Sequence, residues 1–365
     1  MRRFLLFVIF IILLFVGWSF LSEKEHPLTD KTRAFIENGE LQELVANFMN
    51  HVVLFFQQLE DTIDIPPEED IVEKPKLLTP TEQTFSVHNI EIGFKKSAVE
   101  ENLGAPKRIS DNEYGLSWHT YHQNYQNFVQ VMYNDHDQVV GLYTNQDIIS
   151  SSKNIKMGSA KDLVRNELGE PITRIQKGFV FYQLQGESDY DLFRINDSYI
   201  TIFYDIHENN TVTALQIIHE DIEEQKRDFY TEASDSLREG FELQMFDLTN
   251  ATRVQHELKT LEWDERAQGT ARKHSLDMAE NAYFNHTNLA GESPFDRMLK
   301  DNITFSVAGE NLAYGQLSSI FAHEGLMNSL GHRKNILQTD FHFLGVGVAF
   351  NKESHPYYTQ NYFKR

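Results

Sequence analysis

The chain has 365 residues, a length that corresponds to two or three domains of about 100–200 residues each. Hydrophobic residues make up 41% and aromatic residues 12%, which suffices for packed cores and excludes a globally disordered chain. The absence of cysteine excludes disulfides, thiolate metal sites and cysteine-nucleophile enzymes. A formal net charge of −21 excludes a long-range positive field, so we expect no nucleic-acid partner.

The N-terminus carries an apolar segment. Residues 4–21 contain no charge, and these 18 residues are long enough to cross a hydrocarbon layer of about 30 Å. Arg2 and Arg3 precede the segment and favour a cytoplasmic N-terminus. We predict a transmembrane anchor or signal segment over 1–22. The anchor is favoured, because the apolar run exceeds the ~7–15 residues of a signal peptide. The predicted location is the cell membrane, crossed once, with the following domains outside; the alternative is secretion.

The next part, residues 23–84, contains an amphipathic pattern followed by an acidic linker. Apolar residues recur at spacings of four and three between Leu41 and Leu59, which predicts a helix. This stripe packs against the protein itself or forms a homodimer seam through 41–59. Pro66 and Pro67 end the helix, and we interpret about 61–84 as the linker.

An internal repeat follows within a predicted domain over 85–220. Segments 90–93 and 155–158 match at an offset of 65 residues, and so do 103–106 and 168–171. Each copy reads as a strand, a glycine turn, a helix and a Gly-x-Pro stop, with the glycine expected in a left-handed cap. Two hairpins are also predicted, each with a polar turn. Their strands are 128–133 with 139–143, and 199–204 with 212–218. We expect two copies of a small α+β unit packed with pseudo-symmetry.

A charged connector over 221–240 leads into the last domain, 241–365. Ser293 and Pro294 are typical of an N-cap and a first helical residue. Segments 344–350 and 357–363 read as two strands. The most specific sequence blocks of this domain are HSxxMA (274–279), YFxH (283–286), SPFDRM (293–298), GENLAYG (309–315), LMNSxGHRxNIL (326–337) and LGVGVAF (344–350).

This succession of blocks resembles the bacterial branch of the CAP superfamily, also called the SCP-like extracellular domain. The repeat upstream resembles the CAP-associated N-terminal domain of Gram-positive membrane-anchored proteins. The resemblance implies an α+β chain. Its C-terminal part is a three-layer α-β-α sandwich, preceded by the duplicated small α+β domain and the N-terminal transmembrane helix.

The resemblance also implies a cleft that collects two histidines and two acidic residues. The matching positions are His286, Glu310 and His332. The fourth position is Ser329 in this chain, and Glu324 is nearby at a different helical phase. Two imidazoles and a carboxylate suit Zn²⁺ or another divalent metal, with a bound water. The alternatives are a structural role, with Glu310 binding backbone amides and His332 capping a helix, or catalysis.

Three functions follow from these features. The favoured one is an extracellular binding module, held at the membrane, that engages a cell-wall component, a lipid or a protein without catalysis. The second is a metal-dependent hydrolase acting on peptide or cell-wall polymer. The third is a structural or regulatory assembly protein that dimerises through 41–59.

Overall fold

The computed structural model describes residues 72–177, 180–183 and 189–365. The predicted anchor over 1–22 and the predicted helix within 41–59 lie outside the described residues. Residues Val72–Arg365 form one compact unit. No helix within this described part of the chain combines the length and the apolar character that a membrane crossing requires.

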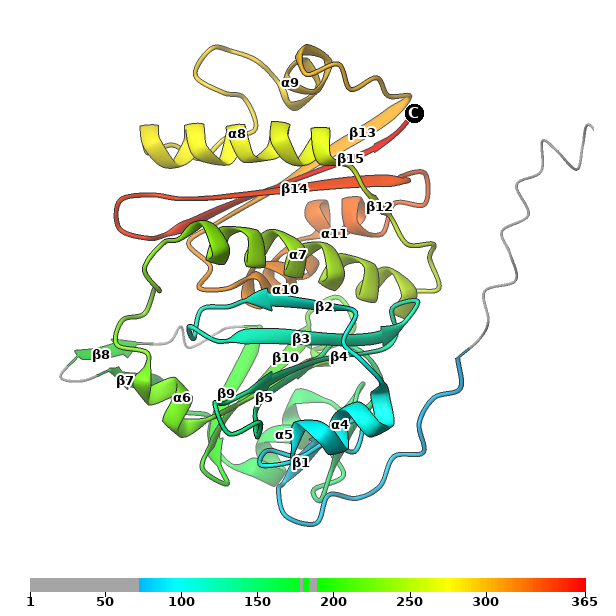
Figure 1. The fold of residues 1–365 in the computed structure, drawn as a ribbon, viewed down its shortest axis with the longest axis vertical. Helices are drawn as coiled ribbons and strands as arrows, with labels where there is room; N and C mark the ends of the chain where they lie inside the picture. Colours follow the sequence, from blue (N-terminus) through cyan, green and yellow to red (C-terminus); the bar gives the residue numbers. More distant parts are fainter. Residues whose placement is uncertain (1–71, 178–179, 184–188) are drawn as a thin grey trace, which may run out of the picture. The chain divides into compact units, whose positions relative to one another are not determined.

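The first half of the unit is built on an antiparallel sheet with strand order β2-β3-β4-β5-β11-β10-β9 (Figure 1). Both predicted hairpins are confirmed, as β4 with β5 and β10 with β11. The sheet is buried on both faces, which explains why its strands read as long apolar runs. The strands are β2 (Arg108–Asp111), β3 (Ser117–Gln123), β4 (Gln126–Tyr133), β5 (Val139–Thr144), β9 (Tyr190–Ile195), β10 (Ser198–Asp205) and β11 (Thr211–His219).

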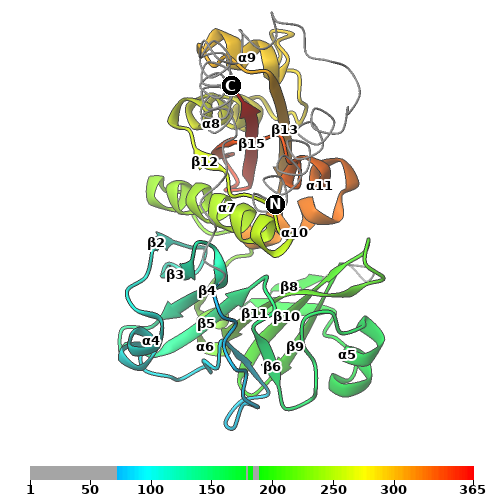
Figure 2. The same cartoon turned by 90° about the vertical axis from the view of Figure 1, so that its right-hand side faces the viewer.

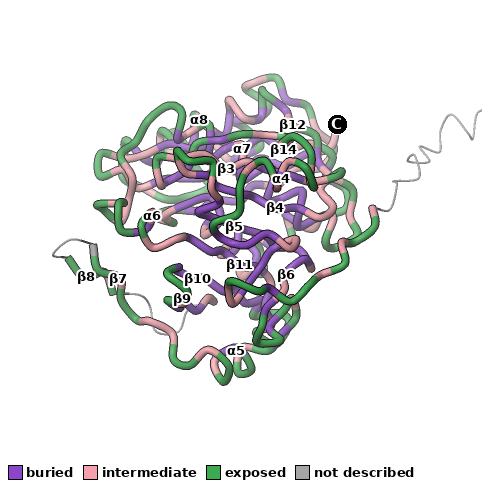
Figure 3. Tube along the Cα trace, turned by 60° about the horizontal axis from the view of Figure 1, so that its bottom comes forward, coloured by how far each residue is buried: buried purple, intermediate pink, exposed green. Residues whose placement is uncertain are grey.

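Small elements surround this sheet. Val99 and Val164 are the buried residues of two short helices and pack in the same core as one face of the sheet. A two-stranded hairpin, β7 with β8, stands apart and exposes Val180 and Phe181 (Figure 3). The elements are β1 (Phe85–Val87), α4 (Lys96–Leu103), β6 (Ile149–Ser151), α5 (Lys161–Leu168), β7 (Arg174–Lys177), β8 (Val180–Gln183) and α6 (Glu220–Gln225).

Two local predictions for the repeat are wrong. Segments 90–92 and 155–157 form no strand; their isoleucines are buried as anchors of loops, while β1 and β6 pair with each other. Gly104 and Gly169 do end α4 and α5 with positive φ, 76° and 86°, as only glycine adopts readily. Their ψ of −163° is extended rather than left-handed helical, because the chain leaves each helix directly into an extended Gly-x-Pro segment.

The sheet order bears on the predicted duplication. Strands β3-β4-β5 occupy one side and β11-β10-β9 the other, so the two successive triplets meet antiparallel at β5 and β11. Strand β2 extends only the first triplet, whereas β7 and β8 form a separate sheet. The duplication itself stays a prediction.

Residues 72–84, predicted as the end of the solvated linker, run along the first domain. The buried carboxylate of Glu91 accepts hydrogen bonds from the backbone N–H groups of Thr81, Glu82 and Gln83, at 3.2, 3.0 and 2.7 Å. Asn89 accepts another from the N–H of Leu78 at 2.8 Å. This stretch therefore has fixed partners on the domain, which its polar composition did not indicate.

The second half of the unit is a mixed sheet, of order β12-β14-β15-β13, between two layers of helices (Figure 2). Helices α8 and α9 lie on one side, and α7, α10 and α11 on the other (Figure 1). The elements are α7 (Asp235–Gln255), β12 (Glu262–Trp263), α8 (Glu265–Asn281), α9 (Pro294–Lys300), β13 (Val307–Tyr314), α10 (Ser319–Asn328), α11 (Leu330–Ile336), β14 (Phe343–Phe350) and β15 (Pro356–Lys364). Ser293 caps α9 as predicted, within a capping box completed by Asp296.

Helix α7 joins the two halves. One of its sides packs against β14, and another packs against β2 and β4. Leu248 and Ala251 share a core with Trp118, Phe128 and Tyr143 of the seven-stranded sheet. The backbones approach so closely that a Cβ at Gly240 would lie 2.0 Å from the carbonyl oxygen of Asp111.

Glycines also set the distance between α8 and the C-terminal sheet. A Cβ on Gly345 would lie 2.2 Å from the backbone of Ala267 and Gln268. A Cβ on Gly347 would lie 2.0 Å from the backbone nitrogen of Arg272. The Gly-Val-Gly pattern of β14 therefore lets the helix backbone lie directly on the strand.

We expect Gly347→Ala to lower the free energy of unfolding by about 3 kcal/mol, because the added methyl group forces α8 away from β14. Gly269→Ala is the matched control: it lies within α8, and no atom lies within 4 Å of the position that its added methyl group would take. The control should raise the free energy of unfolding by up to about 1 kcal/mol through helix propensity. Urea unfolding of both variants measures this, and equal effects would contradict the close-packing argument.

Candidate functional site

Four of the five predicted site residues lie in one region of the C-terminal sandwich. His286 lies in the loop after α8, Glu310 on β13, and Ser329 and His332 at the junction of α10 and α11. Arg297 of α9 joins them through hydrogen bonds. We call these five residues the histidine cluster.

Glu310 is the buried centre of the cluster, with a side chain 2% exposed. One carboxylate oxygen, Oε1, lies 2.8 Å from Nδ1 of His286. The other, Oε2, accepts a hydrogen bond of 2.6 Å from the guanidinium of Arg297. Each oxygen is therefore bonded to a side chain, whereas the structural alternative required backbone amides as partners.

Arg297 holds two parts of the cluster together. Besides its ion pair with Glu310, it donates hydrogen bonds to the backbone carbonyls of His286 at 2.7 Å and Glu292 at 3.0 Å. Its side chain is 8% exposed. A buried guanidinium with three bonded partners fixes the loop that carries His286, and it compensates the buried charge of Glu310.

The second histidine is paired differently. Nδ1 of His332 lies 2.8 Å from the hydroxyl of Ser329. Burial, and after it the nearby His286, lower the pKa of His332. A neutral imidazole accepts the hydroxyl proton of Ser329 at Nδ1. The N-cap position of α11 belongs to Ser329, whose side chain makes no capping bond, and His332 lies inside the helix instead of capping it.

Two asparagines attach α11 to β13. Asn311 is fully buried and donates to the backbone carbonyl of His332 at 3.1 Å. Asn335 donates to the side-chain oxygen of Asn311 at 2.9 Å and to the carbonyl of Glu310 at 3.2 Å. These amides set the position of His332 relative to Glu310.

Glu324 does not join the histidine cluster. It points from α10 toward the seven-stranded sheet, where the hydroxyl of Tyr143 donates to its Oε1 at 2.7 Å. Burial raises the pKa of Glu324 to about 8. The bond from Tyr143 opposes this increase, and the neighbouring carboxylates of Asp189 and Asp205 add to it. The carboxyl is therefore protonated at neutral pH.

The donor set does not fit a metal site through Glu310. Among the described residues, no group of three or more His, Asp or Glu side chains could hold a metal ion. Both oxygens of Glu310 are bonded, and a cation there would compete with the guanidinium of Arg297. The geometry leaves the two imidazole Nε2 atoms as donors, fewer than the three protein ligands of a catalytic zinc. The metal site through His286, His332 and Glu310 stays a prediction that the donor chemistry does not favour.

Sequence reasoning missed several residues that build the site. Arg297 was interpreted only as part of a capped helix. Asn311 and Asn335 were quoted within sequence motifs, without a role in the site. The available signals were an arginine in a short helix and asparagines that have apolar neighbours in the sequence. Such polar groups are buried only when they have partners, and the partners lie far away in the sequence.

Comparison with known proteins identifies the two domains of the chain. Residues 92–229 match the profile "CAP-associated N-terminal" and residues 246–362 match "Cysteine-rich secretory protein family", known as CAP. The chain carries a CAP domain preceded by a CAP-associated N-terminal domain. The CAP domain here contains no cysteine, despite the name of the family.

Relatives from two Bacillus species resemble most of the chain. The "Uncharacterized membrane protein YlbC" of Bacillus subtilis (strain 168) is 29% identical over 75% of this chain and 82% of its own length. The crystal structure of "an extracellular protein containing a SCP domain" from Bacillus anthracis str. Ames matches 81% of this chain and all of its own, with 27% identity and a TM-score of 0.66.

A second similar structure, a cysteine-rich secretory protein of Staphylococcus aureus subsp. aureus Mu50, covers 80% of this chain and all of its own. Its TM-score is 0.61 at 15% identity, so it supports the fold alone. These likenesses confirm the mixed α+β CAP fold that the sequence blocks implied.

We expect Arg297→Met to lower the free energy of unfolding by about 3 kcal/mol, because the buried charge of Glu310 loses its counter-ion. Arg266→Met is the control, since Arg266 is exposed on α8 and makes one weak bond, to the carbonyl of Asn302 at 3.2 Å. It should change stability by less than about 0.5 kcal/mol. Chemical denaturation compares the two, and a harmless Arg297→Met would show that the ion pair is not structural.

The raised pKa of Glu324 predicts a pH effect on stability. In the unfolded chain the carboxyl ionises near its ordinary pKa of 4.5, and in the folded chain near 8. The stability associated with the protonated group is complete below pH 4.5 and is lost as pH rises toward 8. Glu324→Gln keeps the acceptor for Tyr143 and removes the titration.

We therefore expect Glu324→Gln to gain stability over the parent by up to about 4 kcal/mol between pH 5 and pH 8.5. Denaturant unfolding of both proteins at a series of pH values isolates this group, because all other titrations cancel in the difference. The groups that face Glu324 are Tyr143, Asp189, Asp205 and Arg333, and they are present in both proteins. A pH-independent difference would refute the shifted pKa.

Proposed function

We propose that the chain is an extracellular binding module, anchored once in the membrane by its N-terminal segment, whose histidine cluster recognises a component of the cell envelope. The CAP domain and the membrane-protein name of a Bacillus relative support this location. The proposal retains the anchor over 1–22 and the duplicated unit over 85–220. It leaves the homodimer seam through 41–59 as a separate prediction.

One observation favours binding over catalysis. A hydrolytic centre needs a hydroxyl and an orienting carboxylate on the same histidine, and here the two groups contact different histidines. His286 has an orienting carboxylate, Glu310, but no hydroxyl partner for its ring among the described residues. His332 has a hydroxyl partner, Ser329, but within the same described part of the chain no carboxylate orients it. A nucleophile, a base and an orienting acid in one chain of hydrogen bonds are what acyl transfer requires.

The surroundings of the cluster favour contact with a ligand. The side chain of His286 is 51% exposed, although its partners Glu310 and Arg297 are buried. Phe284 and Leu330, close to the two histidines in sequence, are 48% and 55% exposed. Fixed polar groups beside exposed apolar side chains are typical of recognition surfaces.

A hydrolase is the second candidate, because the Ser329 hydroxyl lies 2.8 Å from an imidazole nitrogen of neutral His332. This contact activates a nucleophile in other hydrolases. Binding remains the first choice, since the acid that completes such a centre is bonded to the other histidine. Loss of turnover on wall peptides in a folded Ser329→Ala variant would reverse this order.

The binding proposal is tested with the full chain in detergent micelles, titrated against cell-wall fragments of a Gram-positive bacterium and measured by sedimentation. We expect saturable binding that His286→Ala weakens at least about fivefold, because it removes the exposed recognition group and leaves the fold. His136→Ala, in the exposed turn between β4 and β5, is the matched control and should bind as the parent does. Absent saturation, or equal binding by both variants, rejects the proposal.

A further inference from the structure

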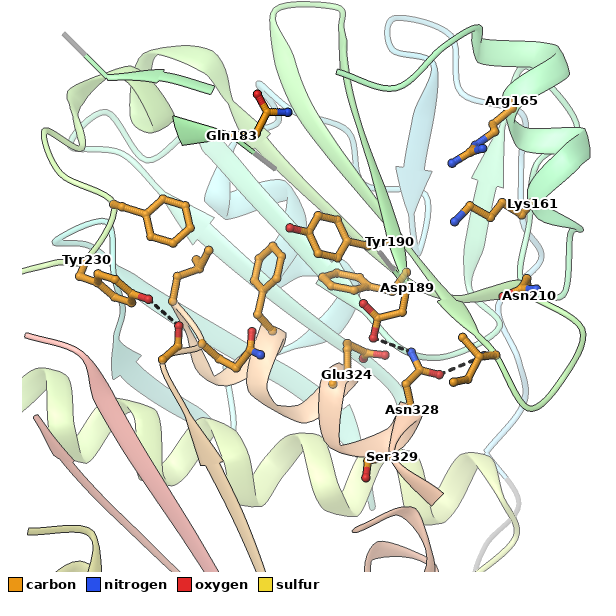
Figure 4. Close-up of a pocket in the computed structure, with 18 residues that line it drawn as sticks. Lys161, Arg165, Gln183, Asp189, Tyr190, Asn210, Tyr230, Glu324, Asn328 and Ser329 are labelled. Atoms are coloured by element: carbon orange, nitrogen blue, oxygen red, sulfur yellow. Dashed lines mark hydrogen bonds between the residues drawn. The ribbon is translucent and has the colours of Figure 1, made fainter. Parts of the chain in front are cut away.

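A second site lies between the two domains, away from the exposed ring of His286. It is a pocket of about 910 Å³, lined by the edge of the seven-stranded sheet on one side and by α10 on the other (Figure 4). Pockets of this size hold small organic ligands. Glu324 and Ser329 line it, so the pocket shares Ser329 with the histidine cluster, whereas the two histidines of the cluster are not among its lining residues. We call it the interdomain pocket.

One end of the interdomain pocket is aromatic. The rings of Tyr190 and Phe321 meet edge to face at 5.2 Å, and Phe321 meets Phe203 in the same way at 5.1 Å. Phe229 and Tyr230 line the pocket from the segment after α6. This packing fixes the rings, while Tyr190, Phe229 and Phe321 remain only partly buried. Fixed aromatic faces offer a surface for the C–H groups of a ligand at little cost in conformational entropy.

The charged groups of the pocket balance one another. Lys161 and Arg165 of α5 both pair with Asp191; Arg165 donates to it twice at 2.8 Å. Asp189 lines the same pocket, and the raised pKa of Glu324 favours its uncharged form. The two cations are thus compensated by Asp191, which is buried behind the pocket lining, and by Asp189, and this balance favours an uncharged ligand over a phosphate or an acidic polymer.

Backbone groups at the rim are already bonded. The side chain of Asn328 donates to the carbonyl of Tyr204 at 2.8 Å. It also accepts from the N–H of Ile206 at 3.0 Å (Figure 4). The hydroxyl of Tyr230 donates a hydrogen bond of 2.6 Å to the backbone carbonyl of Gly315. These three backbone groups are therefore bonded within the protein, so the side chains are the groups at this part of the rim that can bond a ligand.

The polar side chains suit hydroxyl and amide groups. The carboxyl of Glu324 is 3% exposed, and the bond from Tyr143 occupies its Oε1. When protonated, this carboxyl donates to a carbonyl oxygen. Asp189 provides an acceptor near it, and its Oδ2 is oriented by Asn328 at 2.9 Å. An acetamido group presents one carbonyl acceptor and one N–H donor, which matches this pair.

We propose that the interdomain pocket binds an uncharged glycan built of N-acetylated amino sugars, whose ring faces stack on the aromatic end and whose acetamido group lies against Glu324 and Asp189. The proposal names a ligand class for a site other than the histidine cluster. It does not depend on recognition by His286.

The test is calorimetric titration of the full chain in detergent micelles with tetra-N-acetylchitotetraose. Phe229→Ala should weaken binding by about tenfold, because it removes a ring whose contacts are Tyr182 and Tyr230 at the pocket rim. Phe181→Ala, an exposed ring on β8 that does not line the pocket, is the matched control and should bind as the parent does. Cellotetraose, which lacks acetamido groups, should bind at least about fivefold more weakly.

Two further variants test the role of Glu324 and the independence of this pocket from His286. Glu324→Gln should retain binding at pH 7 and at pH 9, whereas the parent should lose affinity at pH 9. His286→Ala should leave binding of the tetrasaccharide unchanged. Absent binding, or equal affinities for Phe229→Ala and Phe181→Ala, overturns the proposal, as does binding of tetra-alanine in place of the sugar. Wall binding without tetrasaccharide binding would reject this proposal and leave the proposed function standing.

Discussion

Helix α7 is buried from two directions, and the arrangement of both domains depends on that constraint. A helix with one solvent face carries its polar residues outward, but here Asp247 and Gln244 lie inside the contact with the seven-stranded sheet. Asp247 accepts from Arg108 at 2.7 Å and from Tyr125 at 2.9 Å, and burial raises its pKa despite these bonds. A buried carboxylate is tolerated only with such partners. The CAP-associated domain therefore supplies the partners of buried polar residues in the CAP domain. In this chain the CAP domain depends on that contact.

The contact between the two domains also positions the histidine cluster. Arg333, next to His332 on α11, pairs with Asp205 at the end of β10 at 2.8 Å, with both side chains nearly buried. Asn328, next to Ser329, bonds to Asp189 at the start of β9. The N-terminal sheet thus holds the α10–α11 junction from one side, while Asn311 holds it from the other. The relative position of the two histidines is a property of both domains.

Sequence patterns predicted those features that local rules determine. The hairpins, the Ser293 N-cap and the CAP sandwich follow from short-range spacing and from specific blocks. The strands expected at 90–92 and 155–157 are absent, because alternating apolar residues anchor a loop as well as they face a sheet. The role of Arg297 and the direction of Glu324 were not readable, since each depends on a partner that the fold brings from elsewhere: Glu310 for the first and Tyr143 for the second. Glu324 was a cleft candidate although its helical phase differed, and the sequence could not show that a second domain lies where Glu324 points.

The lack of cysteine can be understood from the same contacts. Disulfides stabilise small exported domains that bury too little surface to fold alone. In this chain the CAP domain and its partner bury a common core around Trp118 and Leu248, so each enlarges the core of the other. Close backbone approaches add contact area between the domains at Gly240 and between α8 and the CAP sheet at Gly345 and Gly347. Fusion of the two domains therefore substitutes packing for covalent cross-links. The cost is that polar groups at the junction, Glu324 among them, are removed from water, and this places a protonated acid at the wall of the interdomain pocket.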